Sequence, residues 1–137
     1  MNKEWDKIHI SVQKFHNDIL KLAQFIPKDK YRTIVGIPRG GYIIAVYLSH
    51  RFNLPWMDYN FFTRYLNYVE KETVLIVDDI ADTGKTLYKL KGIDCATLYY
   101  KPRSIIKPTY YVGEFKNSEW VEFPYEISNE IPNREVG

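Results

Sequence analysis

The chain has 137 residues, 45% of them hydrophobic, which fits one globular domain over residues 1–137. Its net charge is +2 and its basic residues are scattered, so the sequence gives no case for a nucleic-acid partner. The single cysteine, Cys95, excludes an internal disulfide. The sequence has no signal-peptide pattern and no apolar run near the roughly 20 residues of a membrane span. We therefore expect a soluble cytoplasmic protein with no membrane contact.

The first half of the chain alternates between helical and extended patterns. Apolar side chains recur at steps of three and four over residues 6–26, which predicts a helix with Asp6 as its N-cap and Pro27 beyond its end. A short β-branched strand is predicted over residues 32–37. After a Pro-Arg-Gly-Gly break, the length and spacing of residues 41–52 predict a second helix.

The second half continues this alternation. Strands are predicted over residues 56–62 and 73–79, a short helix over residues 83–91, and further strands over residues 94–101 and 109–115. Strands that are apolar on both faces and alternate with helices indicate an α/β fold. We therefore expect a single Rossmann-like domain with a mostly parallel, twisted sheet flanked by helices.

The clearest strand runs directly into an unusual turn within VLIVDDIADTGKT, residues 74–86. A P-loop is the first alternative to consider, because Gly-Lys-Thr ends this stretch. The motif requires a glycine five positions before Gly84, and Asp79 stands there instead. The backbone nest for a triphosphate is therefore missing, which disfavours a kinase or NTPase.

The turn itself suits a phosphate monoester. It consists of Asp82, Thr83, Gly84, Lys85 and Thr86, and it leads from a strand into a helix. Backbone N–H groups at a helix start bind phosphate with help from the helix dipole. The glycine permits close approach, and the two threonines add hydroxyl donors.

The two acids before the turn, Asp78 and Asp79, suit a different part of the ligand. Carboxylates accept hydrogen bonds from vicinal hydroxyls and can hold Mg²⁺ directly or through water. The implied ligand carries a phosphate at one end and a diol beside it, which describes a ribose 5-phosphate.

On these residues the stretch resembles the phosphoribosyl-pyrophosphate signature of the type I phosphoribosyltransferases. That family transfers ribose 5-phosphate from this donor to a nitrogenous base and releases pyrophosphate, with Mg²⁺. The resemblance implies that Asp78 and Asp79 hold the ribose hydroxyls, that residues 82–86 hold the 5′-phosphate, and that Asp82 lies near the base. It also implies the family fold, with a small hood from the terminal segments.

A second anion site is predicted at IPRGG, residues 37–41, because ligands of parallel sheets bind beyond the carboxyl ends of the strands. Gly40 and Gly41 offer backbone donors, and Arg39 supplies a planar fork suited to pyrophosphate. This loop resembles the Arg-Gly-Gly pyrophosphate loop of the same family. That resemblance implies a cis peptide bond between Pro38 and Arg39.

The acceptor is predicted from the last third of the chain. Lys101 can donate to a carbonyl oxygen, and Trp120 offers a flat stacking face. With backbone groups of Val121 and Glu122, these residues suit a 6-oxopurine such as guanine, xanthine or hypoxanthine. The order of these residues, with EWD at residues 4–6, is similar to the bacterial xanthine-guanine phosphoribosyltransferases, which implies purine salvage.

The resemblance implies a mechanism and leaves alternatives open. Mg²⁺ and Arg39 would stabilise the departing pyrophosphate, while Asp82 would take or hold the purine N7 proton. The family's long closing loop is short here, at residues 61–72, so a partner subunit could help exclude water, and we expect a homo-oligomer, either a dimer or a tetramer. The alternatives are a nucleotide-sensing regulator of this fold that binds nucleic acid, and a transferase for a pyrimidine, orotate or another base.

Overall fold

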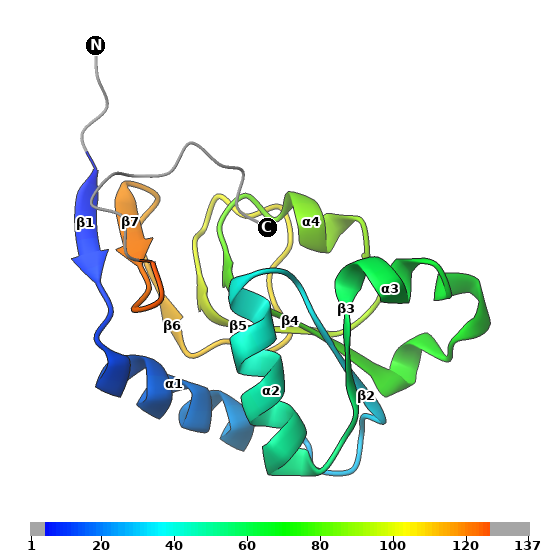
Figure 1. Cartoon of the computed structure of the whole chain (residues 1–137). Helices are drawn as coiled ribbons and strands as arrows, with labels where there is room; N and C mark the ends of the chain where they lie inside the picture. The colour runs from blue at the N-terminus through cyan, green and yellow to red at the C-terminus, as the bar shows by residue number, and fades with distance from the viewer. Residues whose placement is uncertain (1–4, 127–137) are drawn as a thin grey trace.

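The computed structural model of the protein describes residues 5–126 (Figure 1). The strands are β1 (Asp6–His9), β2 (Thr33–Gly36), β3 (Trp56–Asp58), β4 (Val74–Ala81), β5 (Cys95–Tyr100), β6 (Gly113–Glu114) and β7 (Glu119–Glu122). The α-helices are α1 (Val12–Phe25), α2 (Gly40–Phe52), α3 (Tyr59–Thr63) and α4 (Lys85–Tyr88), and the 3₁₀ helices are η1 (Leu66–Tyr68) and η2 (Lys71–Thr73).

The larger sheet has five strands in the order β3-β2-β4-β5-β6, and neighbouring strands in it are parallel. The central strand β4 is buried along its whole length, as expected for a strand covered on both faces. In the register of β2 with β4, Ile34 pairs with Leu75 and Val35 with Ile76. The predicted α/β fold with a mostly parallel sheet is confirmed.

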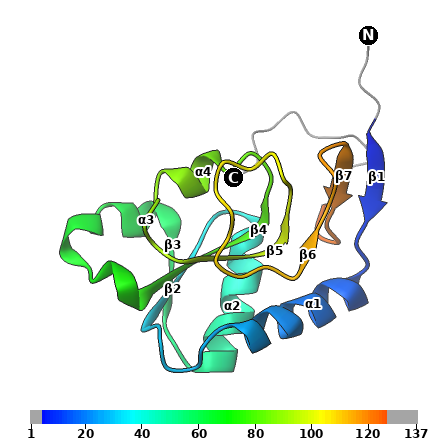
Figure 2. The ribbon, with the colours of Figure 1, turned by 180° about the vertical axis from the view of Figure 1, so that it is seen from behind.

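Alternate residues of the strands supply two hydrophobic clusters, one on each face of the sheet. Ile34 and Leu75 belong to the cluster that includes residues of α1 and α2. Val35 and Ile76 belong to the other cluster, with Phe62 of α3 among its members. Figure 1 shows α2 lying across the sheet from one side, and Figure 2 shows the opposite side, where α3 and α4 lie.

The predicted helix over residues 6–26 is wrong in its first third. Residues Asp6–His9 form β1, and the helix begins after Ser11, whose side chain accepts a hydrogen bond from the backbone N–H of Lys14 at 3.1 Å. The apolar spacing predicted too long a helix, because Ile8 fits the helical period although it belongs to a strand. Pro27 does follow the helix, as predicted.

Two predicted strands are shorter than expected. Residues 56–62 form a strand only at Trp56–Asp58, because Asp58 caps α3 by accepting a hydrogen bond from the backbone N–H of Phe61 at 3.2 Å. Residues 109–115 form a strand only at Gly113–Glu114. The other predicted strands and the helix after Pro-Arg-Gly-Gly are confirmed within a few residues.

The segments near both ends of the described chain pair with each other beside the main sheet. Strands β1 and β7 run parallel, with Ile8 opposite Val121, and they lie side by side in Figures 1 and 2. Lys7 and His9 both contact Glu122, at 2.8 and 3.0 Å. This two-stranded hood confirms the expectation that the terminal segments form one.

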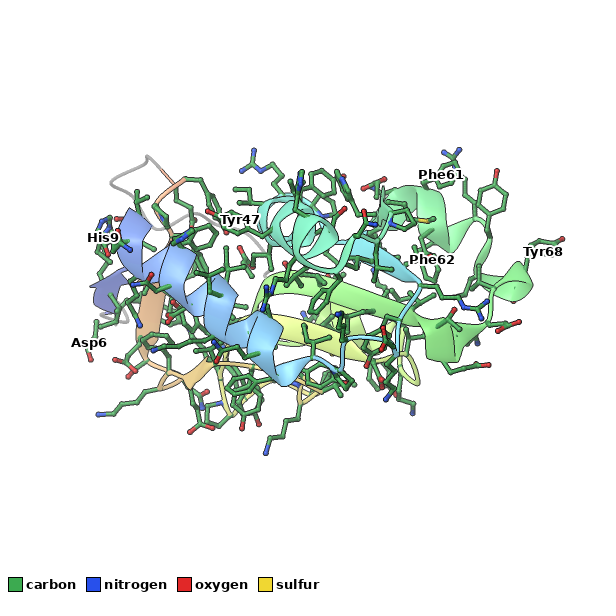
Figure 3. The ribbon with its side chains drawn as sticks, turned by 90° about the horizontal axis from the view of Figure 1, so that it is seen from below. Asp6, His9, Tyr47, Phe61, Phe62 and Tyr68 are labelled. Atoms are coloured by element: carbon green, nitrogen blue, oxygen red, sulfur yellow. The ribbon has the colours of Figure 1, made fainter. Side chains whose placement is uncertain are left out.

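The hood and the α3 region lie at opposite ends of the molecule. Figure 3 shows Asp6 and His9 at one end, and Phe61 and Tyr68 pointing outward at the other, while Phe62 points inward. Among residues 5–126 no helix is long and apolar enough to cross a membrane.

A buried polar contact joins α1 to β5. The hydroxyl of Tyr99 donates to the carboxylate of Asp18 at 2.6 Å, and Lys14 donates to the same oxygen at 2.9 Å. Burial first, and then the Asp18 carboxylate, raise the pKa of Tyr99, so the hydroxyl remains a donor. The contact fixes α1 against the sheet.

Tyr99→Phe should lower the free energy of unfolding by about 1–3 kcal/mol, because it removes the Tyr99 donor from the buried carboxylate of Asp18 and leaves the ring in place. Urea titration followed by circular dichroism would measure this. A variant as stable as the wild type would show that Lys14 alone satisfies the carboxylate.

Candidate active site at the carboxyl edge of the sheet

The two consecutive acids lie in β4, as predicted, and the strand continues two residues beyond the predicted end at residue 79, to Ala81. Asp78 and Asp79 are only 4% and 3% exposed. One carboxylate oxygen of Asp78 accepts the backbone N–H of Asp79 at 2.8 Å, and one oxygen of Asp79 accepts that of Ile80 at 2.7 Å. These hydrogen bonds fix the orientation of both carboxylates near the carboxyl end of the strand.

The helix that follows β4 is shorter than predicted. The helix over residues 83–91 shrinks to one turn, Lys85–Tyr88, so the macrodipole contributes little and anion binding depends on the local N–H groups. Gly84 has a φ of 78°, a left-handed conformation that favours glycine. A Cβ there would overlap the hydroxyl of Ser104, so this glycine also lets the segment after β5 approach the turn.

The other predicted members of the turn flank this glycine. Thr83 Oγ1 accepts the backbone N–H of Lys85 at 3.4 Å, and the carbonyl of Gly84 accepts that of Tyr88 at 2.8 Å. The Lys85 side chain is exposed and Thr86 is half-buried. Residues 82–86 therefore lead from β4 into α4 through one short turn, which is the local structure predicted for them.

The loop after β2 contains the residues that were predicted to form a second anion site. The peptide bond between Pro38 and Arg39 is cis, as predicted. Arg39 is exposed at the start of α2, whereas Gly40 and Gly41 are buried. A Cβ at Gly41 would lie 2.5 Å from the carbonyl oxygen of Val77, so this glycine lets α2 begin directly against β4.

The loop of residues 37–41 lies against the acids of β4, as their shared sheet edge predicts. A Cβ at Gly40 would overlap the carboxylate of Asp79, which places the loop of residues 37–41 against the acids of β4. The same Cβ would also overlap the hydroxyl of Tyr125, which donates to Asp79. Three segments far apart in the sequence therefore converge at one point.

Asp82 lies between two cations that follow β5. It is 3% exposed, and Arg103 Nε donates to one of its oxygens at 2.6 Å, with a second nitrogen of Arg103 paired to the same oxygen. The amino group of Lys101, itself 1% exposed, lies 3.5 Å from the other oxygen. Lys101 and Asp82, which were each predicted to lie beside the acceptor base, therefore contact each other, and Arg103 is a further member that was not predicted.

Trp120 and Val121 lie in β7 and are mostly buried. The edge of the Trp5 ring meets Trp120 with 5.7 Å between ring centroids. The amino group of Lys101 lies 5.1 Å from the centre of the Trp5 ring, and the Arg103 guanidinium lies 5.7 Å from it. Trp5 therefore links the predicted stacking residue to the two cations at Asp82.

The backbone of the same strand is partly engaged. The carbonyl of Glu122 accepts the backbone N–H of Ile10 at 2.8 Å, which extends the pairing of β1 with β7. The predicted contact of a base with backbone groups at Val121 and Glu122 must use groups that this pairing leaves available.

Three residues of this region were not identified from the sequence, namely Trp5, Arg103 and Tyr125. The Trp5 signal was present in EWD, and Arg103 stands two residues after Lys101. No local pattern indicates the contact of Tyr125 with Asp79, because Asp79 lies 46 residues earlier.

Comparisons with known proteins match this arrangement. The family model described as "Phosphoribosyl transferase domain" matches residues 57–129. A curated xanthine-guanine phosphoribosyltransferase from Cereibacter sphaeroides is 27% identical, over 88% of this chain and 87% of that protein. One from Desulfotalea psychrophila is 26% identical, over 93% and 91%.

A solved structure agrees with these sequence relatives. The purine phosphoribosyltransferase from Pyrococcus horikoshii superposes with a TM-score of 0.73 at 31% identity, covering 96% of this chain and 99% of that one. The chain therefore belongs to the phosphoribosyl transferase domain family, and the resemblance to type I phosphoribosyltransferases drawn from its sequence is confirmed.

Gly40→Ala should weaken the binding of magnesium pyrophosphate at least about tenfold, or ~1.4 kcal/mol, because its Cβ would displace the Asp79 carboxylate and the Tyr125 hydroxyl. Isothermal titration calorimetry would measure the affinity, and circular dichroism would check the fold.

Gly92→Ala is the matched control for this substitution. Gly92 has a φ of 98°, and no atom lies within 4 Å of the position a Cβ would take, so the variant should lose about 1–2 kcal/mol of stability and keep its pyrophosphate affinity. Equal losses of affinity in the two variants would contradict an anion site at residues 37–41.

Proposed function

We propose that the chain is a purine phosphoribosyltransferase of purine salvage. It transfers ribose 5-phosphate from phosphoribosyl pyrophosphate to a 6-oxopurine (guanine, xanthine or hypoxanthine) and releases pyrophosphate. The observation that carries this proposal is that the glycine loop of residues 37–41 lies against one of three buried acids at the carboxyl edge of the sheet, while a buried lysine lies beside another. The xanthine-guanine and purine transferases among its relatives support the choice of acceptor.

The donor lies across the two loops in this proposal. The turn of residues 82–86 binds the 5′-phosphate, and residues 39–41 bind the pyrophosphate with backbone donors and the Arg39 guanidinium. Asp78 and Asp79 accept hydrogen bonds from the ribose hydroxyls. Since these groups are already fixed by the strand and by the close approach of α2, the site mainly contributes positioning.

The two acids of β4 also fit a Mg²⁺ ion. They offer hard oxygen ligands, and among residues 5–126 no group of three or more His, Cys, Asp or Glu side chains could enclose a metal. Protein sites with one or two carboxylates hold Mg²⁺ together with substrate phosphates and water. When bound, Mg²⁺ neutralises charge on the pyrophosphate, while Asp78 and Asp79 hold its position.

The acceptor lies beside Asp82 and Lys101. Lys101 donates to O6 of the purine, and Asp82 accepts the N7–H. Because Arg103 already occupies one oxygen of Asp82, the oxygen that faces Lys101 is the better placed of the two for the base. Trp120 and Trp5 supply aromatic walls.

The reaction exchanges one bond at the ribosyl C1. The bond from C1 to the pyrophosphate oxygen breaks, and the bond from C1 to purine N9 forms. Arg39 stabilises the charge of the departing pyrophosphate. Asp82 holds or takes the proton at N7, so that N9 has an electron pair for C1.

A panel of bases tests the proposal. Purified protein with phosphoribosyl pyrophosphate and Mg²⁺ should release pyrophosphate with guanine, xanthine or hypoxanthine, and much more slowly with adenine or orotate. Release with orotate alone would assign another base. Donor binding without release for any base would favour the nucleotide-sensing regulator.

The cytoplasmic location and the homo-oligomeric state remain predictions from the sequence.

Asp82→Asn should lower kcat by a factor of about 10²–10⁴ while the fold survives. The reason is that the amide of asparagine cannot take the N7 proton. Steady-state pyrophosphate release would measure the loss. Asp94→Asn is the control, since Asp94 contacts Tyr31 and Lys30 at the opposite end of β5. Unchanged turnover in the Asp82 variant would remove this residue from the proposed role.

A further inference from the structure

The hydroxyl of Tyr125 reaches into the acids of β4 from the segment that follows β7. It donates to Oδ2 of Asp79, while Oδ1 of the same carboxylate accepts the backbone N–H of Ile80 at 2.7 Å. Asp79 is nearly inaccessible to solvent, so these two donors fix the plane in which its oxygens lie.

The contact lies where the two halves of the donor site meet. A Cβ at Gly40 would overlap both the carboxylate of Asp79 and the hydroxyl of Tyr125. Tyr125 therefore touches the acid proposed to hold the ribose and closely approaches the loop proposed to hold the pyrophosphate. Its hydrogen bond lies within the donor site rather than on a remote surface.

The ring of Tyr125 is held firmly enough to fix its hydroxyl. It stacks on Phe123 with 5.5 Å between centroids and an interplanar angle of 5°, and its edge meets Phe15 at 5.7 Å. The hydroxyl held in this way is the donor of the hydrogen bond, because a carboxylate oxygen can only accept.

The bond leaves Asp79 able to bind a ligand. A carboxylate oxygen has two acceptor positions, so Oδ2 can accept the Tyr125 hydroxyl and a ribose hydroxyl together. A donor on a carboxylate also lowers the cost of burying its charge. The hydroxyl thus orients the acid without using up its binding capacity.

We propose that Tyr125 is a positioning residue of the donor site, which holds the Asp79 carboxylate in the orientation that binds the ribose of phosphoribosyl pyrophosphate. This inference rests on the proposed function. It extends the site to the segment that follows the acceptor strand β7, so the same stretch of chain lines the base pocket and orients a donor ligand. A hydrogen bond to a buried charge is strong enough for its loss to change affinity about tenfold.

The chain contains a matched control for removing this hydroxyl. Tyr99 stacks on Phe123 at 5.8 Å, and its hydroxyl donates to another buried carboxylate, Asp18, at 2.6 Å. Tyr99→Phe and Tyr125→Phe therefore remove the same group from the same aromatic stack. Only Tyr125→Phe changes an acid of the donor site.

The test measures donor binding directly, without a base. Isothermal titration calorimetry with phosphoribosyl pyrophosphate and Mg²⁺ should give about tenfold weaker binding for Tyr125→Phe than for the wild type, and unchanged binding for Tyr99→Phe. In turnover assays, Tyr125→Phe should raise the KM for the donor and leave the KM for the purine unchanged.

Several results would overturn the role of Tyr125. Unchanged donor affinity in Tyr125→Phe would show that Asp79 needs no such orientation, and tighter binding would show that the hydroxyl competes with the ligand. If Tyr99→Phe weakened donor binding equally, the loss of affinity would come from altered packing of the aromatic stack. If the wild type binds the donor but turns over no base, the transferase proposal fails, whereas weaker donor binding by Tyr125→Phe still supports the role of Tyr125.

Discussion

The burial of three carboxylates at the end of one strand is the constraint on which the rest of this site depends. Asp78, Asp79 and Asp82 are each less than 5% exposed, and a buried charge destabilises a protein unless donors or cations surround it. Donors come from the β4 backbone and from three residues distant in the sequence, Lys101, Arg103 and Tyr125. Satisfying the acids therefore brings the segments after β5 and β7 over the carboxyl end of β4, which is where an acceptor must lie for a donor bound to the acids.

The sequence predicted well those features that follow from local pattern. The apolar run of β4, the helix of residues 41–52 and the turn at Gly84 each depend on neighbouring residues, and the structure contains all three. It failed for β1, because Ile8 fits a helical period and only the partner strand β7, more than a hundred residues later, determines its conformation. A short strand whose partner is so distant carries too little local information to be distinguished from the first turn of a helix.

The same distinction between local and distant partners separates the two halves of the site. The donor side lies in two short motifs, so its acids and glycines could be identified from spacing alone. On the acceptor side, Lys101 could be identified as a residue after a strand, but Arg103 reaches Asp82 across 21 residues. Tyr125, which contacts the donor-site acid Asp79, reaches it across 46 residues. Their function comes from the path of the chain over the sheet edge, which no local pattern records.

The path of the chain over the sheet edge also affects how water is excluded from the site. The segment at residues 61–72, where the family has a long closing loop, is short in this chain. Part of this segment, with Arg32 and Val74, lines a hollow of about 210 Å³ at the amino ends of β2 and β4, the edge opposite the acids. Cover at the acceptor end comes from the hood, where Trp5 packs on Trp120 beneath the two cations beside Asp82. β1 and β7 are joined along their length, so the strand that carries Trp120 is held by paired backbone. In the proposed function, this paired backbone shields the acceptor side and takes over part of the role of the family's long closing loop.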